Sequence, residues 1–250
     1  MEEDKRPDPK PRKHLLLWQT YLLHNELVEM RKRRVLRISS IEAGKSNMDI
    51  EFERYWLETL QLDAMIEKAK QMMIVEGQIV GPIWDWTLQI RGLGSGSLNA
   101  QLLAQFDDVG KFATVSKFWR FSGWAVIDGK RERGQKGQTS KYNRRLKSIC
   151  YLVGDQFIKQ QTPRYVDLYY AEKDRLRELH PEPVEIPDPP KGTWKFQFSD
   201  SHIHRMARRK MVKIFLQHLW VRWREFEGLP VSEPWIIAQG GHANYIPPFH

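Results

Sequence analysis

Apolar residues recur at intervals of three or four positions in several long runs of this 250-residue chain. One run starts at Leu15 and continues into the basic stretch RKRRVLR, and a second follows the break EAGKSN and reaches Ala69. Such spacing places the apolar side chains on one face of a helix, and signals for strands are sparse. The chain is therefore predicted to be mainly α, and its first two runs to form a helical hairpin or coiled-coil arm. An ordinary helical subdomain packed on the rest is the alternative for these runs.

Composition and capping residues indicate where the remaining segments of the chain begin and end. The stretch HPEPVEIPDPPKGTW is rich in proline, which is typical of a linker. The long run after it can be capped by Ser199 or Asp200 and ended by Gly228. The expected segments are a disordered basic, proline-containing tail at 1–13, a helical arm at 14–80, a helical domain at 81–180, a linker at 181–198, a long basic amphipathic helix at 199–228 that packs on the domain, and an irregular tail at 229–250.

The charge balance points to an anionic partner. Lys and Arg number 40 against 31 Asp and Glu, a formal net charge of +9, which predicts attraction to nucleic acid or to an anionic membrane. No run approaches the roughly 18 apolar residues of a membrane span, and the N-terminus lacks the apolar core of a signal peptide. We therefore expect a cytoplasmic protein without membrane contact. The single cysteine, Cys150, is expected to be a buried thiol, and no metal or cofactor is expected.

The glycine-rich stretch RGLGSGSLNAQLL, which includes Gly92, matches a helix-hairpin-helix pattern. Gly94 and Gly96 are followed by the small Ala100 and the apolar Leu103 at the expected spacing. Glycines permit a tight turn whose backbone N–H groups can meet a phosphate at a helix N-terminus. A dinucleotide-binding loop would need a third glycine where Asn99 stands. A glycine-rich turn between helices without a ligand remains an alternative.

The loop DGKRERGQKGQTSKYNRR is the second predicted contact with phosphate. Its cations would position a duplex through the sugar-phosphate backbone without reading its sequence. The candidate residues of the loop are Lys130, Arg131, Arg133, Lys136, Lys141, Asn143, Arg144 and Arg145. The long helix at 199–228 adds the candidates Arg208, Arg209 and Lys210.

From residue 90 onward, the order of these signals resembles the C-terminal transposase domain (a helix-hairpin-helix and serine transposase domain) of the insertion-sequence family whose recombinases are guided by a bridge RNA. The matching positions are Gly92, Gly94, Phe112, Gly123, Gly129, Gly137, Ser140, Lys141, Asn143, Arg144, Tyr169, Tyr170, Ala207, Arg209 and Lys210. The resemblance implies a DNA-binding protein of transposition or recombination, with a guide RNA among the candidate partners. The preceding helices resemble the family's coiled-coil segment, which implies a homodimer.

The chain departs from the family pattern in two places. Only residues 1–13 precede the first expected helix, so the family's N-terminal RuvC-like domain, with its four metal-binding carboxylates, is not expected here. The family's nucleophilic serine directly precedes the loop glycine, but this chain has Asp128 before Gly129. Ser140 and Ser122 are the nearest hydroxyls, and both are weak candidates for the nucleophile. The loop is predicted to bind DNA rather than to react with it.

Three functions remain open from the sequence. The first is a DNA-binding protein that is not catalytic alone. The second is an active strand-transfer recombinase that works with a separate RuvC-like catalytic subunit. The third is a structural assembly protein that uses the helical arm, with the basic charge serving solubility.

Overall fold

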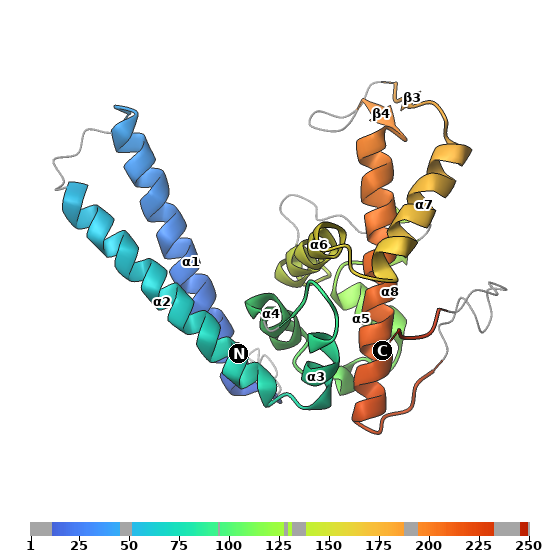
Figure 1. Cartoon of the computed structure of the whole chain (residues 1–250), viewed down its shortest axis with the longest axis horizontal. Coiled ribbons are helices and arrows are strands. Elements are labelled where there is room, and N and C mark those ends of the chain that lie inside the picture. Colours follow the sequence, from blue (N-terminus) through green and yellow to red (C-terminus); the bar gives the residue numbers. More distant parts are fainter. Residues whose placement is uncertain are drawn as a thin grey trace, which may run out of the picture. The chain divides into compact units, whose positions relative to one another are not determined.

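The computed structural model describes residues 12–45, 52–94, 96–127, 130–131, 139–187, 195–232 and 246–249. These residues are mainly α-helical, as predicted, and they include two short two-stranded ladders (Figure 1). The chain divides into two compact units, Met1–Gly81 with Ser95–Asp108, and Pro82–Gly94 with Val109–His250. None of the helices within the described ranges is long and apolar enough to cross a membrane.

The first unit contains the predicted helical hairpin. Helices α1 (Leu15–Glu42) and α2 (Phe52–Gln78) pack along each other. Arg31 is paired with Asp63, and Arg34, further along α1, is paired with Glu58, which lies earlier in α2. Because the partner in α2 moves backward as α1 advances, the two helices are antiparallel.

The interface between α1 and α2 is apolar at its centre. Leu27 of α1 packs with Leu62, Ile66 and Ala69 of α2. Burial of apolar side chains of this size stabilises the pair by about 1.5–3 kcal/mol for each residue. The alternating three-and-four spacing of the sequence therefore marks the side of each helix that meets the other.

Helix α4 (Ser97–Phe106) also belongs to the first unit, where it packs on α1 and α2. The sequence had placed this segment in the domain at 81–180. Every side chain from Leu102 to Phe106 is buried, so α4 needs contacts on more than one side. The adjoining Asp107 accepts a hydrogen bond from the backbone N–H of His14, with 3.0 Å between nitrogen and oxygen.

The second unit is organised around α8 (Asp200–Phe226). Ser199 occupies the N-cap position and Gly228, with φ of +64°, follows the end of the helix, as the sequence predicted. All residues from Phe215 to Val221 are buried, so this part of α8 is covered on every side rather than amphipathic.

Five helical elements pack on α8. They are α3 (Pro82–Leu88), the 3-10 turn η1 (Val109–Lys111), α5 (Val115–Phe121), α6 (Arg144–Lys159) and α7 (Tyr165–Leu179). Two buried donors of α8 reach the same backbone oxygen. The indole N–H of Trp220 donates to the carbonyl of Phe112 at 2.8 Å, and Nη1 of Arg224 donates to it at 3.1 Å. These bonds fix the segment between η1 and α5 against α8.

Two short ladders occur where the sequence predicted no strands. Strand β1 (Val126–Ile127) pairs with β2 (Lys130–Arg131) inside the predicted basic loop. Strand β3 (Val184–Glu185) pairs with β4 (Phe196–Gln197), so the two ends of the predicted linker are joined. Strands of two residues leave almost no alternating pattern in a sequence, which explains why they were missed.

Part of the predicted irregular tail, Ile246–Phe249, contacts α7 and α8. Nε2 of His218 lies 2.9 Å from the carbonyl oxygen of Ile246, and Arg164 donates to the carbonyl of Phe249 at 2.6 Å. The ring of Phe249 packs between those of Tyr165 and His218.

Gly154 of α6 marks a close approach to α8. A Cβ atom at this position would lie 2.6 Å from Cγ2 of Val212. We expect Gly154→Ala to lower the free energy of unfolding by up to about 2 kcal/mol, because overpacking of this kind costs about 1–3 kcal/mol and alanine's helix propensity returns about 1 kcal/mol. Urea unfolding measures the change. Ser148→Ala, at an exposed position of the same helix, is the control; equal stability of both variants would contradict the prediction.

Candidate nucleic-acid interface

The two ends of the basic loop are held together at its base. The backbone N–H of Asn143 donates to the carbonyl of Phe121 at 2.9 Å. Gly123, with φ of +73°, lies against Tyr142, and a Cβ atom there would be 2.7 Å from Cδ2 of that ring. The loop therefore leaves and re-enters the folded unit at one place.

Arg209 of α8 holds the start of the same loop. Its Nη2 donates to the carbonyls of Trp124 and Ala125, both at 2.9 Å. The guanidinium also lies over the indole of Trp124, 5.3 Å from the ring centroid. Because Trp124 is fully buried, these contacts anchor the base of the loop to the core of the second unit.

The end of the loop runs into a cation-rich first turn of α6. Asn143 is the N-cap, and its Oδ1 accepts a hydrogen bond from the N–H of Leu146 at 3.0 Å. Lys141, Arg144 and Arg145 are exposed beside this turn, and the turn contains no acidic residue. A cation at a helix N-terminus is disfavoured by the helix dipole. An anion bound there is favoured both by the dipole and by the neighbouring cations. The turn therefore combines exposed cations with a helix N-terminus that has no acid to neutralise them.

The middle of the loop is described only in part. Lys130 and Arg131 form β2, with Ile127 opposite Lys130 and Val126 opposite Arg131. Asp128, Arg133 and Lys136 lie outside the described residues.

The glycine-rich turn joins the two units of the chain. Gly92, with φ of +94°, leaves little room for a side chain, since a Cβ atom would lie 3.3 Å from both the carbonyl oxygen of Gln156 and Oγ1 of Thr162. Gly94, with φ of +50°, has open space around it. Gly96 is the N-cap of α4, whose first turn contains no acid. The helices on either side of the turn belong to different units, because α3 packs on α8 and α4 packs on α1 and α2.

The candidates on α8 are engaged by groups of the protein itself. Arg208 is paired with Asp155 and lies over the ring of Tyr151. Lys210 donates to Oε2 of Glu172 at 2.5 Å, and Arg209 binds the two carbonyls at the base of the loop. The sequence could not distinguish these contacts from a solvated basic face. All three side chains therefore make contacts within the second unit.

The two weak candidates for a nucleophile differ in their surroundings. Ser122 is fully buried, and its Oγ lies within hydrogen-bonding distance of the carbonyls of Phe118 and Trp119, at 3.0 and 3.1 Å. The Oγ of Ser140 is buried without a hydrogen-bond partner among the described residues. The N-cap of α6 is Asn143 rather than Ser140. Both hydroxyl oxygens are therefore buried.

Sequence reasoning missed the residues that close the loop. Tyr142 and the carbonyls of Trp124 and Ala125 carry no recognisable pattern, because their role depends on chain segments that meet only in the fold. The pair Asp128-Gly129 was a usable signal, since Asp-Gly favours a two-residue turn between paired strands.

Burial raises the pKa of the Cys150 thiol, in agreement with the buried thiol that the sequence predicted. No group of three or more potential metal ligands occurs within the described ranges. No known protein family, curated protein or solved structure matches the chain. Any statement of function therefore depends on the residues themselves.

Arg209→Gln tests the anchor of the loop. The variant leaves two carbonyl oxygens without their guanidinium donor, and we expect the free energy of unfolding to fall by about 1–3 kcal/mol. Thermal unfolding measures this loss as a decrease of about 2–12 °C in the melting temperature. Arg145→Gln removes an exposed charge of the same kind and is expected to leave the melting temperature unchanged. A similar small effect for both variants would show that Arg209 is not structural.

Proposed function

We propose that the protein binds DNA through the phosphate backbone and acts in DNA transposition or recombination without being catalytic alone. The observation that carries the proposal is the cation-rich first turn of α6 at the closed base of the basic loop. A fixed base holds the cations of Lys141, Arg144 and Arg145 in one place, which reduces the entropy lost on binding.

The interface consists of the loop and the start of α6. The exposed cations next to the helix N-terminus offer a phosphate both charge and backbone N–H groups. In the first unit, the first turn of α4, which has Gly96 as its N-cap and also lacks acids, is a separate proposed contact with phosphate. Arg208, Arg209 and Lys210 support this interface from α8 through their contacts within the protein.

The resemblance to the bridge-RNA-guided transposase family supports the choice of DNA. Its matching positions include Gly123 and Asn143, which close the loop, and Arg209, which anchors it. A proposal that the chain reacts with DNA has less support, because Ser122 is buried against two carbonyls and Asp128 stands at the family's serine position.

Removing the charges of the α6 turn tests the DNA interface. If about six phosphates are bound, the logarithm of the association constant should fall with the logarithm of salt concentration with a slope of about −5. We expect Arg144→Gln with Arg145→Gln to weaken duplex binding regardless of sequence and to reduce the slope by about two. Fluorescence anisotropy with a labelled duplex at several salt concentrations measures both quantities.

Lys159→Gln is the matched control, because Lys159 lies in the last turn of the same helix. It should leave the affinity and the slope unchanged. The double variant should also keep its thermal stability, since the helix dipole disfavours cations at this end. No detectable duplex binding by the unaltered protein at low salt would remove the proposal.

The helical hairpin supports a homodimer. The line along which α1 and α2 pack is called the seam. Leu16, Leu23 and Met30 recur every seven residues on α1, and each directly precedes a position of this seam. Met65 and Met72 of α2, and Ile79 directly after the end of that helix, have the same spacing and also directly precede seam positions. Residues seven apart lie on one side of a helix.

These six side chains lie on the same flank of the hairpin. A twofold axis perpendicular to the plane of two antiparallel helices relates one helix to the other. Because this rotation does not exchange the two sides of the plane, equivalent positions on the two helices lie on the same side. The surface hollow that is lined by both Leu16 and Ile79 agrees with this arrangement. The six side chains are between 41% and 69% exposed, so this flank presents apolar side chains to solvent at seven-residue intervals, which we call the apolar stripe. A second copy that covers it would complete a four-helix arrangement.

Leu23→Glu with Met72→Glu tests this contact. Two carboxylates at the same level of the stripe should prevent apolar packing, and we expect a dimer to become a monomer in sedimentation equilibrium. Leu60→Glu, at an exposed apolar position of α2 that directly follows a seam position, should leave the dimer intact. Dimers of equal stability in all three proteins would place the contact elsewhere.

A further inference from the structure

A cavity of about 380 Å³ lies within the second unit, between α5, α7 and α8. Cavities that hold small ligands in proteins measure about 300–1,000 Å³, so this one is large enough for a ligand. Its lining includes Trp119 from α5, residues of α7 and α8, and Ile246 from the docked tail. No residue of the cavity other than Lys210 was among the candidates from the sequence.

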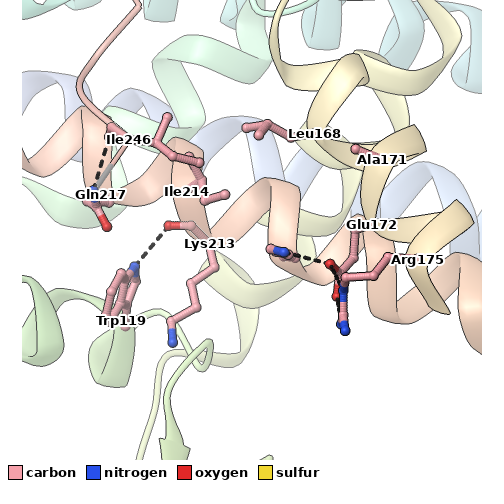
Figure 2. A pocket seen from close by; sticks show the side chains of 10 residues that line it. Trp119, Leu168, Ala171, Glu172, Arg175, Lys213, Ile214, Gln217 and Ile246 are labelled. Carbon is pink, nitrogen blue, oxygen red and sulfur yellow. Dashed lines mark hydrogen bonds and ion pairs between the residues drawn. The ribbon is translucent and has the colours of Figure 1, made fainter. Parts of the chain in front are cut away.

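The two ends of the cavity differ in chemistry. Leu168, Ile214 and Ile246 lie toward one end, where Ala171 leaves space because its side chain is small (Figure 2). The ammonium of Lys213 and the guanidinium of Arg175 lie toward the other end. A ligand that fills both ends needs an apolar body and an anionic group.

The polar end carries more positive than negative charge. Its carboxylate, Glu172, has a side chain that is only 9% exposed. Glu172 accepts from Nε and Nη2 of Arg175 at 2.9 and 2.7 Å, and from Lys210 at 2.5 Å. Burial alone would raise the pKa of Glu172, but these hydrogen bonds outweigh it and the pKa is lowered. Glu172 is therefore ionised and already accepts three hydrogen bonds from cations.

Lys213 is the cation that this carboxylate does not neutralise. Its ammonium lies 4.1 Å from the centroid of the Trp119 ring, and no carboxylate of the described residues is paired with it. Burial, and secondly the charge of Arg209, lower the pKa of Lys213. Burying an ammonium without a counter-ion costs free energy, so an anion bound beside Lys213 would offset this cost.

We propose that the cavity binds one nucleotide, with the base against Leu168 and Ile214 and the phosphate at Lys213 and Arg175. Gln217 provides an amide for the edge of the base, since its hydrogen bond to the carbonyl of Ile246 is long, at 3.4 Å, and can be exchanged. The choice of a nucleotide among amphipathic anions rests on the proposed nucleic-acid function. The nucleotide is either free or an unpaired nucleotide of a bound strand.

Calorimetric titration of the full chain with AMP tests the cavity directly. We expect AMP to bind, and both adenosine and inorganic phosphate alone to bind at least tenfold more weakly, because each fills only one end. Lys213→Met keeps the aliphatic stem but removes the charge, and it should weaken AMP binding at least tenfold. Ala171→Phe should abolish binding by filling the apolar end. Lys159→Met, at an exposed position outside the cavity, should bind AMP like the unaltered protein.

A duplex with one unpaired 2-aminopurine distinguishes the two sources of the nucleotide. A change in its fluorescence that is lost in Lys213→Met assigns the cavity to a strand, whereas AMP binding without this change assigns it to a free nucleotide. Absence of both signals, or AMP binding that Lys213→Met and Ala171→Phe leave unchanged, overturns the proposal. If Ala171→Phe does not fold, Lys213→Met alone decides.

Affinity for a fully paired duplex separates this proposal from the proposed function. Paired duplex binding without any signal from AMP or 2-aminopurine rejects the nucleotide cavity and leaves the DNA interface in place. AMP binding without duplex binding rejects the DNA interface and keeps the cavity. Binding of an aromatic carboxylate such as naphthoate in preference to AMP overturns the assignment to a nucleotide.

Discussion

The burial of α8 on all sides between Phe215 and Val221 is the constraint on which the second unit depends. Polar groups on such a helix must find partners within the protein, because an unpaired buried donor costs about 1–3 kcal/mol. Trp220 and Arg224 meet this requirement at one carbonyl, that of Phe112. Further toward the N-terminus of α8, the half-buried Arg209 likewise binds the carbonyls at the base of the basic loop, and Arg208 and Lys210 are paired with Asp155 and Glu172.

The cations of α8 and those at the start of α6 differ in their contacts, and this difference connects stability with the proposed function. Cations on α8 hold structure, and Arg209 in particular fixes the point at which the loop leaves the core. Cations at the start of α6 remain exposed beside a helix N-terminus without acids. A phosphate would therefore meet groups that are already positioned, while the side chains that position them stay in place.

The two units expose surfaces of different chemistry. The hairpin of the first unit exposes an apolar stripe, which suits a second copy of the chain. The second unit exposes a cationic turn, which suits a phosphate, and encloses a cavity with one apolar and one cationic end. Each surface follows from local packing within its own unit.

The sequence by itself determined the helices, because three-and-four spacing of apolar residues has one solution that buries them. It also located Gly228 and placed Lys141, Arg144 and Arg145 among the candidate cations. It could not show that α4 joins the hairpin, that Asn143 rather than Ser140 caps α6, or that β1 and β2 pair. Only the tertiary structure decided which cations are exposed and which are bound. Identical guanidinium groups differ only in whether an acceptor far away in the chain, such as the carbonyl of Trp124, is brought within reach by the fold.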